Sequence, residues 1–161
     1  MSIDYATIWA LIIVLGVMVY VVLDGFDLGI GIVFPTLNST SWRDHAMNSI
    51  APVWDGNETW LVLGGGGLLA AFPTAYALLL PALYLPILLM LSALILRGVA
   101  FEFRFKSQRS QFIWDWAFFI GSLFAAFFQG IILGSVVQGF EIESNLYVGG
   151  SFSWLSSFSI F

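Results

Sequence analysis

The sequence contains no cysteine, which excludes disulfide bonds, thiolate metal centres, iron–sulfur clusters and redox CxxC pairs. Its only histidine is His45, so the chain has little capacity to ligate a haem or a metal by itself. We expect His45 to lie in a loop at the cytoplasmic interface rather than to act as a ligand. Charge is scarce too, since charged residues make up 9% of the 161, against about a quarter in an average soluble domain. With 60% hydrophobic residues, the chain is predicted to be a membrane protein largely covered by lipid.

Basic residues are especially rare, because five Lys and Arg stand against ten Asp and Glu, a net charge of −5. No basic cluster alternates with aromatic residues, so we expect no nucleic-acid partner. The basic residues all follow the first long apolar segment or lie at and after the third (Arg43, Arg97, Arg104, Lys106, Arg109). The positive-inside rule therefore predicts that the first and third loops are cytoplasmic and the N-terminus is outside. Residues 1–5 contain no Lys or Arg, so we expect no cleavable signal peptide.

Apolar segments long enough to cross a bilayer as a helix, about 20 residues each, recur along the chain. The sequence predicts four of them, at about 6–33, 47–72, 76–100 and 112–137. We therefore expect residues 1–143 to form an all-α, four-helix transmembrane bundle. Residues 144–161 are expected to be a loop and the start of a fifth helix that stops too soon to cross, so we interpret the chain as a fragment. Small residues at helical spacing favour close helix approach (Gly25 and Gly29, Gly64 to Gly67, Gly130 and Gly134).

Ionisable residues within these segments indicate function, because each costs about 2.5–3.5 kcal/mol to place in a bilayer. They are Asp24, Asp27, Asp55, Glu58, Arg97, Glu102 and Asp115. With the N-terminus outside, all of them lie at one depth near the cytoplasmic side. Six carboxyls face one intramembrane arginine, so some are expected to be protonated, hydrated or bound to a cation. Such carboxyls can exchange protons near neutral pH, which is the chemistry of a proton relay.

The spacing places these acids in pairs on helical faces. Asp24 and Asp27 share one face, with Tyr20 four residues before Asp24, and Asp55 and Glu58 share another. Three interpretations remain open for them. The acids could conduct protons, Asp24 and Asp27 could bind a monovalent cation, or Arg97 could bridge carboxylates only to fix helix packing.

Five sequence motifs resemble subunit II of cytochrome bd-type quinol oxidases. They are DGFDLGIG at 24–31, NSIAPVWDGNETWL at 48–61, AAFP at 70–73, RGVAFEFR at 97–104 and WDW at 114–116. The resemblance covers essentially the whole chain. It implies an integral subunit of about eight helices built as two four-helix halves, of which this chain is the first half.

The resemblance also implies what such a subunit does. It binds no haem itself, while its partner, subunit I, carries the haems and oxidises quinol, and the electrogenic complex reduces oxygen to water in the bacterial inner membrane. Membrane lipid is a further partner, and a small accessory subunit is left open. Asp55 is expected near the cytoplasmic mouth of a proton pathway, assisted by Glu58. The remaining matched positions are expected to form an internal polar network or cation site (Asp24, Asp27, Arg97, Asp115).

Two other function classes remain open at this point. A proton- or cation-coupled transporter would also place paired acids on a helix inside the membrane, with this chain as one of its halves. In a purely structural scaffold, Asp55 would be dispensable.

Overall fold

The computed structural model describes residues 4–143, 146–150 and 152–155, and the chain there is almost entirely helical. The long helices are α1 (Tyr5–Val33), α3 (Trp54–Ala71), α4 (Pro73–Lys106) and α5 (Gln111–Gln138). Shorter elements are α2 (Thr40–Ile50) and the 3-10 turns η1 (Phe34–Thr36), η2 (Gln108–Ser110) and η3 (Ser153–Leu155). Among the described residues, three helices are long and apolar enough to cross a membrane: α1 with η1, α4, and α5. The all-α membrane class is therefore confirmed.

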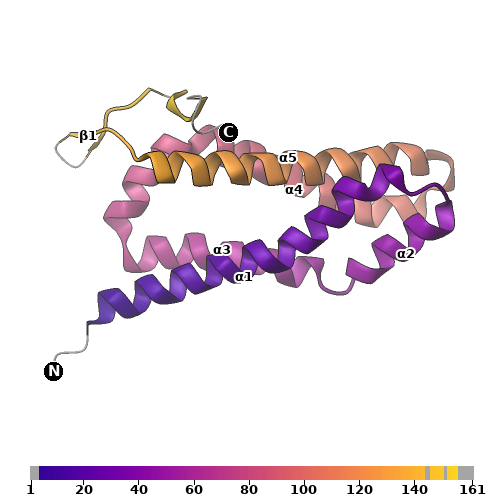
Figure 1. Cartoon of the computed structure of the whole chain (residues 1–161), viewed down its shortest axis with the longest axis horizontal. Coiled ribbons are helices and arrows are strands. Elements are labelled where there is room, and N and C mark those ends of the chain that lie inside the picture. Colours follow the sequence, from indigo (N-terminus) through magenta and orange to yellow (C-terminus); the bar gives the residue numbers. More distant parts are fainter. Residues whose placement is uncertain (1–3, 144–145, 151, 156–161) are drawn as a thin grey trace.

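The long helices form two pairs, α1 with α3 and α4 with α5, and α1 also crosses onto α5 (Figure 1). The start of α1, the α3–α4 turn and the segment after α5 lie at one end of the molecule. The α1–α2 and α4–α5 connections lie at the other end, which we call the basic end because Arg43, Arg104 and Lys106 lie there. Each pair of helices is thus antiparallel.

Local sequence explains how α1 begins. Asp4 is the N-cap of the helix, and its carboxylate accepts hydrogen bonds from the backbone N–H groups of Ala6 and Thr7. The Thr7 hydroxyl donates to the same carboxylate at 2.5 Å. These hydrogen bonds, with that from the Thr7 side chain largest, lower the pKa of Asp4 below its ordinary value.

The second predicted segment, 47–72, is not one continuous helix. The structure ends α2 at Ile50 and starts α3 at Trp54, with a turn over residues 51–53. The reason is Pro52, which has no backbone N–H with which to continue the helical hydrogen bonds beyond Ala51. α2 also starts earlier than predicted, at Thr40, and packs Met47 and Ile50 into the core at the basic end.

The other helices agree more closely with the prediction. α1 and α5 match the segments 6–33 and 112–137 to within one residue at each end. α4 extends from Pro73 to Lys106, well past the predicted end at 100. Figure 1 shows that its first turns cross from α3 toward α5 before the helix runs along α5. Pro81 and Pro86 lie within α4 and account for this bend, because each removes a backbone hydrogen bond.

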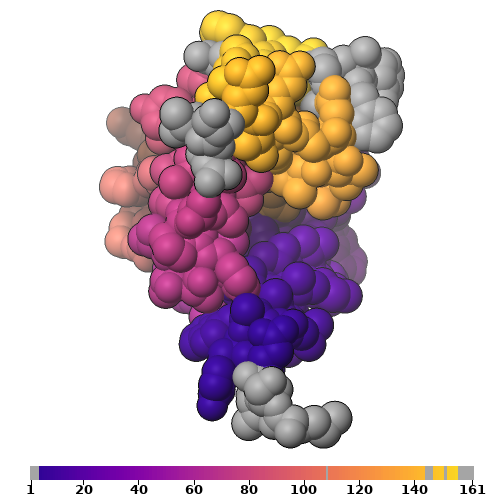
Figure 2. Space-filling view, turned by 90° about the vertical axis from the view of Figure 1, so that its left-hand side faces the viewer, coloured from indigo at the N-terminus to yellow at the C-terminus, as the bar shows by residue number. Residues whose placement is uncertain are grey.

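The segment after α5 contains structure that the sequence did not predict. β1 (Ile142–Glu143) pairs antiparallel with β2 (Leu146–Tyr147), and η3 follows. We call β1, β2 and η3 together the hairpin segment. Figure 2 looks onto this end of the molecule, where the hairpin segment lies beside the start of α4 and far from the start of α1. Most of the predicted start of a fifth helix, residues 156–161, lies outside the described residues.

Close helix approach occurs at other glycines than most of those predicted. A Cβ on Gly121 of α5 would lie 2.7 Å from the Ala93 carbonyl oxygen and 2.9 Å from the backbone nitrogen of Arg97. A Cβ on Gly31 of α1 would lie 2.0 Å from the Ser122 hydroxyl. Gly64 and Gly67 do contact α1, whereas Gly25, Gly29 and Gly130 face open space. The backbone at Arg97 is therefore pressed directly against α5.

Candidate functional site

Arg97 is the centre of a buried ionic cluster that joins three helices. Its side chain, on α4, is 0% exposed. Its Nη2 donates to Asp24 Oδ1 of α1 at 2.8 Å and to Glu58 Oε1 of α3. Because α1, α3 and α4 all contribute side chains to it, the cluster links the two helix pairs. We call Arg97, Asp24, Asp27 and Glu58 the Arg97 cluster.

Neighbouring side chains position the cluster. Asp27, one turn after Asp24, accepts a hydrogen bond from Asn57 Nδ2 at 2.8 Å. The indole of Trp54 lies 6.0 Å from the Arg97 guanidinium and stacks on Phe101 with ring centroids 4.9 Å apart. Trp54 thus places an aromatic ring in contact with both the guanidinium of Arg97 and the ring of Phe101, one helical turn nearer the basic end.

The cluster contains more buried polar atoms than its protein contacts satisfy. Among the described residues, Asp24 Oδ2, Asp27 Oδ1, and Arg97 Nε and Nη1 are buried without a hydrogen-bond partner. Two of its three carboxyls, Asp24 and Glu58, also share one guanidinium. A buried polar atom without a partner is costly, so donors and acceptors in this mixture suit bound water or an added proton.

Exposure falls steadily along the acids. Asp55, in the first turn of α3, is exposed, and in the described part of the chain its carboxylate forms no ion pair. Glu58, one turn further, has 23% of its side chain exposed, and Asp24 has 1%. The acids therefore lead from the surface of the chain to the buried guanidinium.

Asp115 does not join this cluster, although the sequence grouped it with Asp24, Asp27 and Arg97. It belongs to a second network, in which its Oδ1 accepts from Arg104 Nε at 2.5 Å and its Oδ2 from Arg43 Nη1 at 2.8 Å. Arg104 Nη1 also donates to Asp44 Oδ1 at 2.6 Å. We call Arg43, Asp44, Arg104 and Asp115 the Arg104 cluster.

The Arg104 cluster packs around the ring of Phe34. The guanidinium of Arg104 lies 5.5 Å from the Phe34 centroid and that of Arg43 lies 5.9 Å away. Two cations and two anions balance, which is the pattern of a structural network. Sequence reasoning did not assign Arg43, Asp44 or Asn57 to a site, because their partners are 30 to 72 positions away along the chain.

Two further predictions concern residues away from these clusters. His45 lies on α2 rather than in a loop, where it is exposed and its Nδ1 is 2.8 Å from the Ser41 carbonyl oxygen. Glu102 and Lys106 form an exposed ion pair of 2.7 Å along α4, as their spacing predicts. His45 and the Glu102–Lys106 pair therefore belong to neither of the two ionic clusters.

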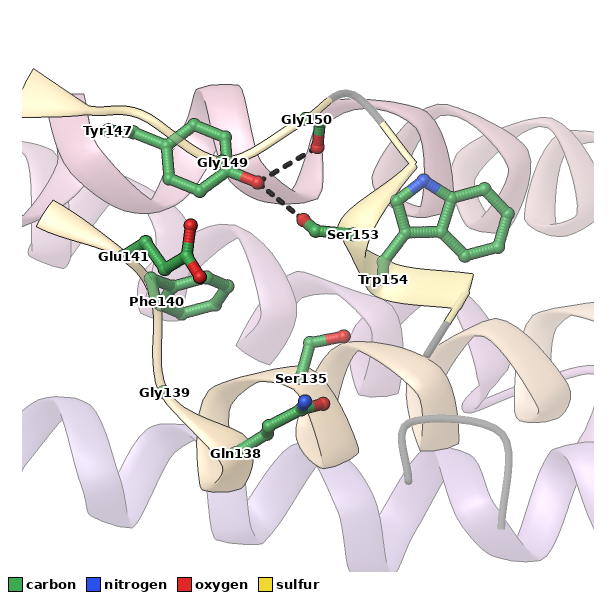
Figure 3. Close-up of a pocket in the computed structure, with 10 residues that line it drawn as sticks. All are labelled: Ser135, Gln138, Gly139, Phe140, Glu141, Tyr147, Gly149, Gly150, Ser153 and Trp154. Atoms are coloured by element: carbon green, nitrogen blue, oxygen red, sulfur yellow. Dashed lines mark hydrogen bonds between the residues drawn. The ribbon is translucent and has the colours of Figure 1, made fainter. Parts of the chain in front are cut away.

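A pocket of about 150 Å³ lies at the opposite end of the molecule, between the end of α5 and the hairpin segment (Figure 3). The Tyr147 hydroxyl points into the segment and donates to the Gly150 carbonyl oxygen at 2.9 Å. It also hydrogen-bonds Ser153. These contacts hold the hairpin segment together internally, and the pocket is remote from both ionic clusters.

Comparison with known proteins identifies the family. A family model for cytochrome bd terminal oxidase subunit II matches residues 5–161. The chain is 36% identical to cytochrome bd-I ubiquinol oxidase subunit 2 of Escherichia coli (strain K12) over 169 aligned residues, which cover 98% of this chain and 45% of that protein. It is 35% identical to cytochrome bd ubiquinol oxidase subunit 2 of Bacillus subtilis (strain 168), over 88% of this chain and 43% of that protein.

A third relative, the probable cytochrome oxidase subunit 2 of Haemophilus influenzae, is 36% identical over 94% of this chain and 42% of its own length. The chain thus spans less than half the length of these relatives. The match does not favour the transporter interpretation, and it confirms the resemblance seen in the motifs. The chain belongs to the cytochrome bd terminal oxidase subunit II family.

Proposed function

We propose that the chain works as part of a non-haem subunit of a bd-type quinol oxidase in the bacterial inner membrane. Two of the named relatives are subunits of ubiquinol oxidases, which supports an oxidoreductase that oxidises quinol and reduces oxygen. In this proposal, the haems belong to subunit I, and the chain supplies a proton route and a packing surface for that partner. The complex is electrogenic because protons are drawn from the cytoplasm.

The proton route starts at Asp55 and leads through Glu58 to the Arg97 cluster. The observation that carries it is the fall in exposure from Asp55 through Glu58 to Asp24. This series joins the surface to buried polar atoms that have no hydrogen-bond partner in the described part of the chain. Glu58 touches Arg97 directly and lies one turn from Asp55, so it can receive a proton at the surface side and pass it inward. The partnerless atoms around Arg97 suit water that carries the proton between carboxyls.

The same proposal orients the chain in the membrane. The basic end is placed in the cytoplasm by the positive-inside rule, so the N-terminus lies outside. α3 then forms a fourth span beside the three more apolar helices, since its 18 residues rise about 27 Å, close to the ~30 Å of a bilayer core. Asp55 starts α3 and therefore faces the cytoplasm.

The test replaces Asp55 with a neutral isostere in the complete oxidase complex. Asp55→Asn is expected to leave the haems bound and to slow quinol-driven oxygen consumption on the order of 10²-fold, the low end of what a positioned proton-transfer group contributes. The reduced-minus-oxidised visible spectrum measures assembly, and an oxygen electrode measures turnover per haem.

Glu102→Gln is the matched control, because Glu102 is an acid on an exposed helix face and, among the described residues, forms an ion pair with Lys106 alone. It is expected to leave turnover unchanged. If Asp55→Asn turns over like the control, the proton route is wrong, and the acids of α3 serve only as a scaffold.

A further inference from the structure

A partly buried hydrogen bond joins α1 to α5 on the side of the Arg97 cluster that lies away from the basic end. Gln129 Nε2 of α5 donates to the Tyr20 hydroxyl oxygen of α1 at 2.5 Å. Tyr20 is only 3% exposed, so water does not surround this hydroxyl. Because the oxygen accepts from Gln129, the hydroxyl proton is left for another acceptor.

A buried acceptor in need of a donor is on the next turn of the same helix. Asp24 follows Tyr20 by four residues, which places the two side chains on one face of α1. Asp24 Oδ1 is occupied by Arg97, whereas Oδ2 has no formed hydrogen bond among the described residues.

We propose that Gln129 holds Tyr20 so that the Tyr20 hydroxyl donates its proton to Asp24 Oδ2. Tyr20 is then a positioning residue for Asp24, and Gln129 positions Tyr20. An O–H donated to a carboxylate stabilises its ionised form and so keeps Asp24 paired with Arg97. The inference deepens the proposed function and rests on it, since Asp24 is the inner acid of the proton route.

The arrangement forms one continuous series of polar side chains through the membrane interior. Its members are Glu58 on α3, Arg97 on α4, Asp24 and Tyr20 on α1, and Gln129 on α5. All of the long helices thus contribute a polar side chain to it. Gln129 is the last member of this series of polar side chains, because its amide is a neutral group that does not titrate near neutral pH.

Infrared spectroscopy of the complete oxidase complex, prepared with ¹³C-labelled aspartate, tests the hydrogen bond itself. The Asp24 carboxylate stretching band is the one that disappears in Asp24→Asn. Tyr20→Phe and Gln129→Leu are each expected to shift this band in the same direction, and the double variant to shift it no further. Tyr84→Phe, which removes an exposed hydroxyl on α4, is the matched control and leaves the band in place.

An Asp24 band that stays unchanged in Tyr20→Phe, in a complex with a normal haem spectrum, overturns the inference. If Tyr20→Phe fails to assemble, cryo-electron microscopy of the unmodified complex decides instead. A Tyr20 Oη to Asp24 Oδ2 distance of about 2.5–3.0 Å supports the hydrogen bond, and a clearly longer one overturns it.

This readout separates the inference from the proton route. Normal turnover in Asp55→Asn together with a shifted Asp24 band would mean that the route is wrong and the hydrogen bond is real. Slow turnover in Asp55→Asn, together with an Asp24 band that Tyr20→Phe does not shift, would mean that the proton route stands and the hydrogen bond is wrong.

Discussion

Arg97 and Arg104 lie seven residues apart on α4, about two helical turns, and both are fully buried, yet their surroundings differ. Arg104 shares its cluster with a second arginine and two aspartates, so the charges cancel. Arg97 is the single cation among Asp24, Asp27 and Glu58, and several atoms of its cluster lack protein partners. A balanced cluster holds helices together, whereas an unbalanced one has room for protons and water.

The two clusters also differ in their access to the surface. Glu58 connects the Arg97 cluster to Asp55, which is exposed at the start of α3. The Arg104 cluster instead closes around Phe34 and joins the α1–α2 segment to α4 and α5. We therefore assign proton transfer to the Arg97 cluster and helix anchoring to the Arg104 cluster. The predictions below test this division.

The largest expected effect is on assembly, when Arg104 is removed. Arg104→Leu leaves Asp115 buried with only part of its compensation and should destabilise the subunit by about 3–5 kcal/mol, as breaking a buried ion pair does. The yield of haem-loaded complex from membranes, and its thermal unfolding midpoint, measure the loss. Adding Asp115→Asn should restore part of the yield. A single variant that assembles and melts like the unmodified complex would show that the cluster does not anchor the helices.

A different outcome is expected at Glu58. Glu58→Gln keeps the Arg97–Asp24 ion pair, so the complex should assemble, while oxygen consumption per haem falls about tenfold because an acid of the route is gone. Asp115→Asn is the contrasting variant, since it should lower the yield but not the turnover of the complexes that assemble. Equal turnover losses in the two variants would remove the distinction between the clusters.

The close contact of α4 with α5 at Arg97 gives a smaller effect on stability. Gly121→Ala places a methyl group 2.7 Å from the Ala93 carbonyl oxygen, which forces the helices apart and should cost about 1–3 kcal/mol. Gly130→Ala, on the same helix with nothing within 4 Å, should stabilise it by up to about 1 kcal/mol. Thermal unfolding of the complex compares them. Matching midpoints would mean that the approach at Gly121 is not tight.

The smallest effect is expected at the exposed pair on α4. Lys106→Met breaks the ion pair with Glu102, in which the Lys106 side chain is 69% exposed and the Glu102 side chain 66% exposed. The change should alter the free energy of unfolding by less than about 1 kcal/mol. Its melting curve is compared with that of Arg104→Leu. A loss similar to that of Arg104→Leu would show that burial does not decide what these pairs contribute.

Hydropathy and charge placement predicted much of this architecture. α1 and α5 match the apolar segments closely, because lipid-facing helices are defined mainly by length and composition. The break at Pro52 was missed because a run of mostly apolar residues masks a local backbone constraint. The hairpin after α5 was missed because two-residue strands carry no periodic pattern.

The site was predicted less completely than the helices. Spacing and orientation placed Asp24, Glu58 and Arg97 at one depth, and the structure brings those three side chains into contact. Sequence position did not show that Asp115 pairs with Arg104 and Arg43, because those contacts depend on how α2, α4 and α5 pack. Asn57 and Gln129 carry no charge and were not selected, although both hydrogen-bond to buried acids or their neighbours.

Proton uptake from the cytoplasmic side shows directly whether Asp55 and Glu58 carry protons to the Arg97 cluster. The complete complex is reconstituted in vesicles with the basic end facing a pH-sensitive dye, and uptake is timed after oxygen is added to the quinol-reduced enzyme. The account predicts that Asp55→Asn and Glu58→Gln slow proton uptake in step with oxygen consumption, whereas Asp115→Asn leaves the rate per haem unchanged. Proton uptake at the unmodified rate in both α3 variants would contradict it.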